Sequence, residues 1–316
     1  MNFNACPSFT DALYPEVIRR FHDRYEPEKL WKQVPFESGY DNFFGDPMIG
    51  VPLNTISLNS GGHLHHNSMD TIDKVDPRSL RVLSTIDAVY LYYMANAGFD
   101  DVPSVARVTN EHVMGVILEK TSEMRARLAE AGNGEQLGKL LADGVKVIDY
   151  YTGLQVEALR RIERLVPENR KREAREILTP YYNDVTEFGK LMTKQFTEAV
   201  QNKAKAGSIT IVKYEEKTGP WEKEAATIVP KRTKVGTLTL EGIPYEEWAE
   251  VKSSPRWWSE TEWATASYFW CDGRRNLNDI KTLLELEAGV PVRDFDLIKF
   301  YTFLEKYKLV EFVKGR

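Results

Sequence analysis

Three of the five histidines occur within four positions of the stretch GGHLHHNSMDTIDKVDP, residues 61–77. Imidazole is the commonest protein ligand for metal ions, and a run of acidic and turn-forming residues follows. A zinc site needs three or four ligands, and a two-metal hydrolytic site also needs carboxylates. His63, His65 and His66 have no second histidine cluster downstream. Their spacing alone therefore favours a surface loop that supplies at most one part of a metal site.

The two remaining histidines lie away from this stretch. His22 and His112 both fall in charged patterns with helical periodicity. Charged helical patterns of this kind are typical of solvated helix faces. We therefore expect both imidazoles to face solvent.

The segments on either side of the histidine loop predict how it is held. Residues 51–59, VPLNTISLN, form a short apolar run with β-branched residues, which favours a buried strand. Residues 76–98 favour a helix, with Asp76 as its cap, Pro77 in its first turn and Gly98 at its end. The expected apolar face of this helix comprises Leu80, Val82, Leu83, Ile86, Val89, Tyr90 and Tyr93.

The pattern changes along the chain and suggests four parts. Residues 1–100 favour an α/β arrangement. Residues 101–205 alternate acids and bases at helical spacing, which predicts a helical hairpin or small bundle with solvated faces. Residues 206–235 favour a linker with strand character. Residues 236–316 predict helix, helix, helix and strand, the order of a winged-helix module.

Composition limits the partners that the chain is expected to have. The formal net charge of −5 gives no general attraction to nucleic acid, and residues 236–316 hold 14 acidic against 11 basic side chains. No apolar run approaches the roughly 18 residues of a membrane span. Cys6 and Cys271 lie far apart and form no disulfide or metal spacing. We therefore expect no nucleic-acid or membrane partner and a reducing compartment, the cytoplasm.

Residues 50–98 resemble the C-terminal end of the catalytic domain in the M28 family of zinc aminopeptidases. That domain ends with a Gly-Ile-Pro strand, then a loop of the form Tyr-His-Thr/Ser-x-x-Asp-Thr-x-Asp-Lys-Val-Asp, then a long helix. Here GVP, HHNSMDTIDKVDP and the helix that follows agree with this order without a gap. The resemblance covers roughly residues 10–98. The C-terminal part resembles the winged-helix appendage of some M28-like proteins.

The resemblance implies roles for particular residues. His66 matches the last ligand of the co-catalytic zinc pair. His65 stands where the family carries a tyrosine that stabilises the oxyanion, so a catalytic role for His65 departs from the pattern. Asp41 matches the aspartate of an upstream Ser-Asp-His stretch. Asp70 and Asp73 are expected to fix the loop and the helix entry.

The resemblance also implies a fold and an activity. The fold is an α/β domain with a mostly parallel sheet, of which this chain holds the C-terminal part. The activity is peptide hydrolysis by a water that two zinc ions activate. In the family a first histidine, a bridging aspartate, a Glu-Glu pair with the general base and a further aspartate all precede the final histidine. The residues before His66 show none of these motifs.

Three functions remain open at this point. In the first, the chain is a fragment or subunit of an M28-like peptidase, inactive alone, that acts on peptides when an N-terminal half complements it, as a homo- or hetero-oligomer. In the second, it is a non-catalytic binding or scaffold protein derived from that family. In the third, it is a winged-helix regulator, which the acidic C-terminal part disfavours.

The expected strand leads to a prediction about an isolated segment. Without neighbouring strands, Val51–Leu58 would have an unpaired edge and an uncovered apolar face. Residues 1–100 expressed alone should therefore aggregate or recruit a partner, as size-exclusion chromatography would show. A stable folded monomer of this segment would contradict the expectation.

Overall fold

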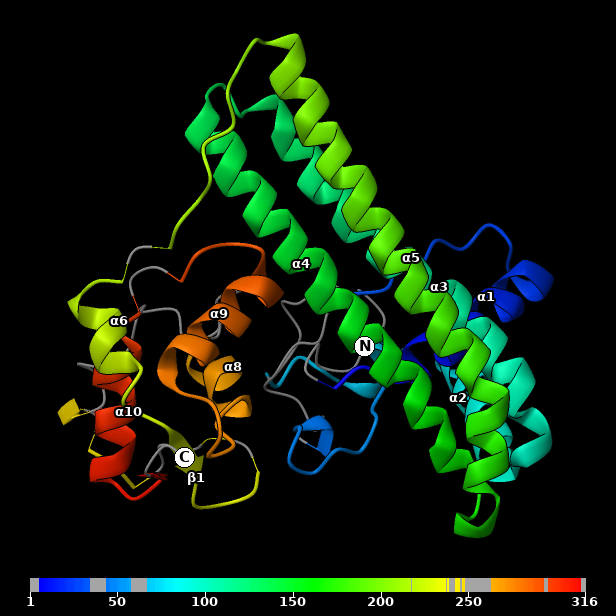
Figure 1. The fold of residues 1–316 in the computed structure, drawn as a ribbon. Coiled ribbons are helices and arrows are strands. Elements are labelled where there is room, and N and C mark those ends of the chain that lie inside the picture. The colour runs from blue at the N-terminus through cyan, green and yellow to red at the C-terminus, as the bar shows by residue number, and fades with distance from the viewer. Residues whose placement is uncertain are drawn as a thin grey trace.

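The computed structural model describes residues 6–34, 44–57, 67–216, 218–236, 238, 242–244, 246–247, 263–292 and 295–313. Figure 1 shows three long helices at the centre, with smaller elements on both sides. The described elements are α1 (Thr10–Tyr25), α2 (Pro77–Asn96), α3 (Val102–Ala126), α4 (Gly134–Arg160), α5 (Lys171–Ala206), α6 (Pro220–Ala225), β1 (Pro230–Arg232), α8 (Trp263–Phe269), α9 (Leu277–Ala288), α10 (Leu297–Lys306) and β2 (Val310–Phe312).

The predicted α/β domain with a mostly parallel sheet is wrong. Of the residues that the structure describes, 67% are helical. The sheet that the described residues form has two short antiparallel strands, with Pro230 opposite Phe312 and Arg232 opposite Val310. Residues 51–57, the described part of the expected strand, belong to no strand. A strand is stable only when a neighbour pairs with its backbone groups, and a short apolar run does not reveal whether such a neighbour exists.

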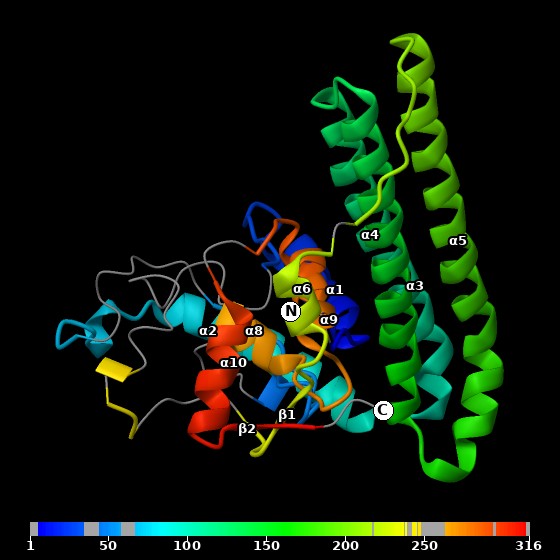
Figure 2. The same cartoon turned by 60° about the vertical axis from the view of Figure 1, so that its left-hand side comes forward.

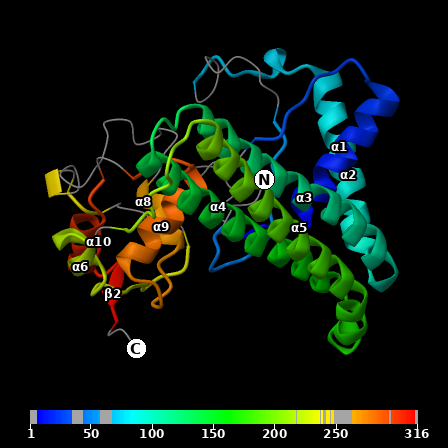
Figure 3. The ribbon, with the colours of Figure 1, turned by 45° about the horizontal axis from the view of Figure 1, so that its top comes forward.

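Helices α3, α4 and α5 pack against one another along their lengths and form the main core. All three views show them side by side (Figures 1, 2 and 3). Fully buried side chains from each helix meet in this core, among them Ile117 of α3, Ile148 of α4 and Phe196 of α5. Asn133 caps α4, since its side chain accepts a hydrogen bond from the backbone N–H of Gln136 (2.9 Å).

Glycines let backbone and side chains approach α4 closely. A Cβ on residue 144 would lie 2.1 Å from the ring of Phe196, and a Cβ on residue 138 would lie 1.7 Å from the carbonyl oxygen of Val212. The segment after α5 therefore runs directly along the start of α4, where the Val212 N–H donates to the Gly134 carbonyl (3.0 Å). These contacts need positions without a side chain.

On one side of the bundle, α1 and α2 form a small second cluster (Figure 3). Tyr14 and Ile18 of α1 pack against Val82 and Ile86 of α2. The Tyr14 hydroxyl donates a hydrogen bond to Asp87. This contact holds α2 against α1, and α1 in turn packs on α3.

The predicted start of α2 is confirmed. Asp76 accepts hydrogen bonds from the backbone N–H groups of Arg78 (3.2 Å) and Ser79 (3.0 Å), and Pro77 is the first helical residue. The predicted apolar face is correct only in part. Leu80 and Val89 are 54% and 52% exposed, because α2 packs on one side only.

On the other side of the bundle, the C-terminal elements share a core of their own (Figure 1). Helices α8, α9 and α10 and strand β2 follow in the predicted order. Helix α9 begins at the predicted cap, Asn276, and ends at Gly289, whose φ of +68° is the left-handed geometry that favours glycine. Ala225 lies in this core and β1 pairs with β2, so residues 220–232 of the expected linker pack with the C-terminal helices. We name residues 220–313 the C-terminal unit.

Gly138 provides a test of the close packing along α4. Gly138→Ala should lower the free energy of unfolding by about 1–3 kcal/mol, because the new methyl group would overlap the Val212 carbonyl. Gly153→Ala, in the same helix, is the matched control, since nothing lies within 4 Å of a Cβ there. Alanine is the better helix former, so this control should gain up to about 1 kcal/mol. Urea unfolding compares the two, and equal effects would contradict the packing.

Candidate functional site

Four sequence-predicted residues lie outside the described part of the chain: Asp41, His63, His65 and His66. The description resumes at Asn67, directly after the histidines. Asp70 is exposed and sits in a turn, where its backbone N–H donates to the Asn67 carbonyl (3.1 Å). The structure thus places Asp70 in solvent at the edge of the loop.

The next two carboxylates bond within the loop and the helix entry. Asp73 accepts hydrogen bonds from the Thr71 hydroxyl and the Lys74 ammonium, and the hydrogen bond from Lys74 lowers the pKa of Asp73. The hydrogen bond from Ser79 likewise lowers the pKa of Asp76, the cap of α2. Both carboxylates are therefore used locally and fix the path of the chain into α2.

Apolar side chains around this loop and along α2 remain in solvent. Ile72 is 86% exposed, Tyr92 75%, Leu91 63% and Met69 62%. Single exposed apolar residues are ordinary, whereas many within one short segment are typical of a surface that another polypeptide covers. We name Met69, Ile72, Leu80, Leu91 and Tyr92 the exposed apolar set.

The most deeply buried charged pair of the described residues joins the N-terminal segment to the C-terminal unit. Arg232 of β1 makes two parallel hydrogen bonds to Asp46, at 2.6 and 2.9 Å, and the two side chains are 1% and 0% exposed. The guanidinium also lies 4.9 Å from the centre of the Tyr268 ring. Such planar, two-point contact is the geometry in which arginine binds a carboxylate best.

The same pair fixes the turn of residues 44–50. The Asp46 carboxylate accepts from the Met48 N–H (2.8 Å), and its carbonyl accepts from the Gly50 N–H (2.7 Å). Gly50 has a φ of +68°, and its carbonyl accepts a hydrogen bond from Arg164, just beyond α4 (2.6 Å). The C-terminal unit and the bundle therefore hold this turn from two directions.

Cys271 and two tyrosines lie close to this pair. Burial raises the pKa of the Cys271 thiol to about 12, although the Arg232 charge partly opposes the shift. Burial also raises the pKa of Tyr268 to about 12 and that of Tyr301 well above its ordinary range. A thiol that stays protonated is a poor nucleophile, so the surroundings of Arg232 serve packing rather than covalent chemistry.

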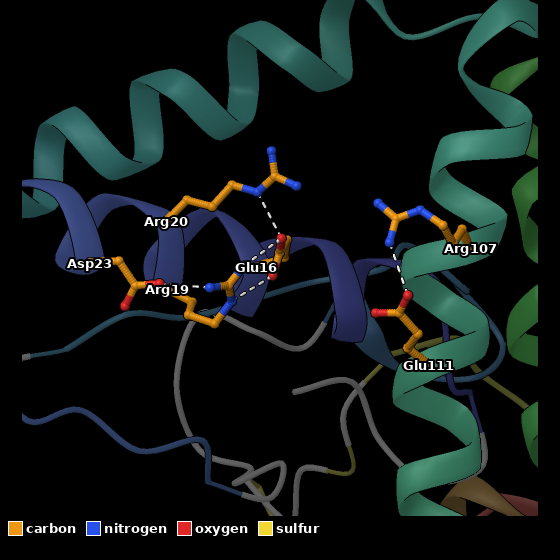
Figure 4. Close-up of polar contacts among 6 residues, drawn as sticks. All are labelled: Glu16, Arg19, Arg20, Asp23, Arg107 and Glu111. Carbon is orange, nitrogen blue, oxygen red and sulfur yellow. Dashed lines mark hydrogen bonds and ion pairs between the residues drawn. The ribbon is translucent and has the colours of Figure 1, made fainter.

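A second charged cluster lies on the surface of α1 and α3. Figure 4 shows its ion pairs among Glu16, Arg19, Arg20, Asp23, Arg107 and Glu111. The hydrogen bond from Arg19 lowers the pKa of Glu16, but the two arginines that contact Glu16 are 51% and 66% exposed. Exposed pairs of this kind each contribute little to stability, and this surface is a solvated helix face.

The two isolated histidines are not solvated, contrary to expectation. The His22 side chain is buried at the end of α1, 3.6 Å from Glu26. Burial lowers the pKa of His112 in α3, an effect that the charge of Asp11 partly opposes. His22 is buried and His112 is half-buried, which the charged periodicity of the sequence does not reveal.

A groove of about 440 Å³ runs between α4 and α5. Gly153 lines it, and nothing lies within 4 Å of where its Cβ would be, whereas the Thr152 side chain fills the space beside Gly189. The charged side chains around it are Asp149, Glu157, Arg160 and Lys190, two of each sign. This balance gives the groove no charge with which to select an ionic ligand.

No three His, Cys, Asp or Glu side chains of the described residues gather as metal ligands would. Among the same residues, no helix is both long and apolar enough to cross a bilayer.

Comparisons with known proteins add no relative. No family model matches the chain, and no curated protein or solved structure shows significant similarity to it.

Removal of one charge from the buried Asp46–Arg232 pair should strongly lower the stability of the fold. Arg232→Met leaves the Asp46 carboxylate buried without its partner, so the free energy of unfolding should fall by about 3–5 kcal/mol. The double variant Asp46→Leu/Arg232→Met should recover most of this loss, because two apolar groups can replace a buried ion pair. Urea unfolding measures both variants.

Arg172→Met is the control, since Arg172 is 88% exposed and should change stability by less than about 0.5 kcal/mol. A single variant as stable as the unmodified chain would contradict the assigned geometry.

Proposed function

We propose that this chain is a part of an M28-like zinc peptidase that cannot act alone. In this proposal it contributes one metal-binding imidazole, His66, and the loop that follows it. A second polypeptide contributes the remaining ligands and the general base, and the completed site hydrolyses peptides. In the completed site, His65 would donate to the oxyanion in place of the family's tyrosine.

The observation that carries the proposal is the position of the exposed apolar set. Met69 and Ile72 lie within the HHNSMDTIDKVDP motif, and Leu80, Leu91 and Tyr92 lie in the helix that follows it. Apolar surface contributes about 25 cal/mol per Å² when it is removed from water. In this proposal, the second polypeptide that supplies the missing ligands also covers this apolar surface.

The residues present do not fit a complete metal centre. The described part of the chain holds no group of three possible ligands, and the resemblance assigns a single ligand, His66. Two-metal hydrolysis needs ions about 3.5–4 Å apart and a carboxylate that takes a proton from water. The proposed hydrolysis therefore requires the second polypeptide.

The proposal includes a reducing compartment such as the cytoplasm. Both Cys6 and Cys271 are free thiols and both are buried. Buried free thiols persist where disulfides are not formed.

A scaffold protein without chemistry is the second candidate. Of the described residues that follow the histidines, 67–77, none belongs to the two larger cores, one in the bundle and one in the C-terminal unit. A scaffold would keep these cores and bind its partners without zinc. Metal content therefore separates the two functions.

The test uses the chain together with the polypeptide encoded directly before it or by the adjacent gene. We expect the purified complex to bind two zinc ions and to release the N-terminal residue of a peptide in a chelator-sensitive reaction. The chain alone should do neither. His66→Ala should lower the zinc content by one ion and the hydrolysis rate at least about 100-fold, because a ligand is lost.

His63→Ala is the matched control, since the resemblance gives His63 no role. It should keep both the zinc and the activity. Zinc and activity that persist in the His66→Ala complex, or chelator-sensitive hydrolysis by the chain alone, would overturn the proposal. A complex without zinc would favour the scaffold.

A further inference from the structure

The C-terminal unit meets the bundle through the last turn of α9, which lies against α4 (Figures 1 and 2). The Tyr150 hydroxyl of α4 donates to the Glu287 carboxyl group at 2.9 Å. Arg127, just after α3, donates to the carbonyl of Gly289 at 2.8 Å. Tyr150 also packs against the core of the C-terminal unit. We name this contact region the α4–α9 joint.

Glu287 is an unusual residue for such a contact because its carboxyl group is largely removed from water. Burial raises the pKa of Glu287 to about 8, and hydrogen bonds from the Tyr150 and Trp270 side chains offset only part of this shift. Burial, followed by the nearby Glu287 charge, also raises the pKa of Tyr150 far above its ordinary range. A neutral carboxyl group against a neutral phenol is therefore the favoured state of the joint near pH 7.

The charged groups around the joint do not neutralise Glu287. Arg275 pairs with Asp272 and stacks on the Trp270 ring. Lys120 pairs with Glu123 and lies over the ring of Tyr151. The titratable groups that face the joint are Glu119, Lys120, Glu123 and Arg127 from α3 and its end, Lys139, Asp143, Tyr150 and Tyr151 from α4, and Arg275 and Glu285 from the C-terminal unit.

We propose that the Glu287–Tyr150 contact makes docking of the C-terminal unit on the bundle sensitive to pH, so that the joint is closed with a neutral carboxyl group and opens when that group ionises. An ionised carboxylate would be buried without a counter-charge, and exposure to water relieves this cost. The Asp46–Arg232 pair holds the unit at another place. Opening is thus a local swing of α9 away from α4.

The direction of the pH effect follows from linkage. Glu287 holds its proton more tightly in the docked state, so docking is strongest below the ordinary glutamate pKa of 4.5. Between this value and about pH 8 the docking constant should fall by up to about tenfold per pH unit. Above about pH 8 both states are ionised and docking should no longer change through this group.

The experiment uses the full chain with fluorescent labels on Lys146→Cys in α4 and Ala288→Cys at the end of α9. Cys6 and Cys271 are buried, so the introduced thiols are labelled selectively. Energy transfer reports the separation of the labels in urea, while circular dichroism reports the helices. We expect the urea concentration that separates the labels to fall from pH 5 to pH 8, before helix content is lost, and to level off above pH 8.

Glu287→Gln, which keeps the shape but cannot ionise, should abolish this slope and remain docked at pH 9. Glu305→Gln, an exposed glutamate of α10, is the control and should keep the slope of the unmodified chain. Circular dichroism at pH 6 checks that each variant folds. The proposal is overturned by an unchanged slope in Glu287→Gln, or by labels that separate only together with loss of the helices.

Discussion

The packing of the Phe196 ring into the space at Gly144 sets the distance between α4 and α5. That distance determines how the helices of the bundle pack, and the other described elements lie against the surface of this bundle. Helix α1 packs on α3, the segment after α5 lies along α4, and α9 ends against α4. The positions of α1 and of the C-terminal unit are therefore set by their contacts with the bundle.

The buried pair of Asp46 and Arg232 gives this arrangement a second constraint. It joins positions that are 186 residues apart, and it does so without water access. Buried ion pairs add little net stability compared with apolar packing, but removal of one partner strongly destabilises the folded state. The pair therefore selects one arrangement of the turn at residues 44–50. This turn directly precedes residues 51–57, which belong to no strand.

The features that the sequence revealed are those set by neighbouring residues. Asp76 and Asn276 cap their helices and Gly289 ends α9, because each acts within one helical turn. The expected strand at residues 51–57 depends on a partner elsewhere, and no local pattern encodes that partner. Arg232 lay in a segment that looks like a polar linker, and its partner Asp46 is far away in sequence. Glu287 resembled an ordinary surface charge at helical spacing, so neither its burial nor its contact with Tyr150 was foreseen.

Hydrogen–deuterium exchange of the intact chain tests most directly whether the bundle and the C-terminal unit, rather than a sheet, organise the N-terminal segment. The amides of Met48 and Gly50, which bond to Asp46, should exchange slowly. The amides of residues 54–57, which lie in no strand, should exchange nearly as fast as in an unfolded peptide. Slow exchange across residues 54–57 with the alternation of a paired strand would contradict the account.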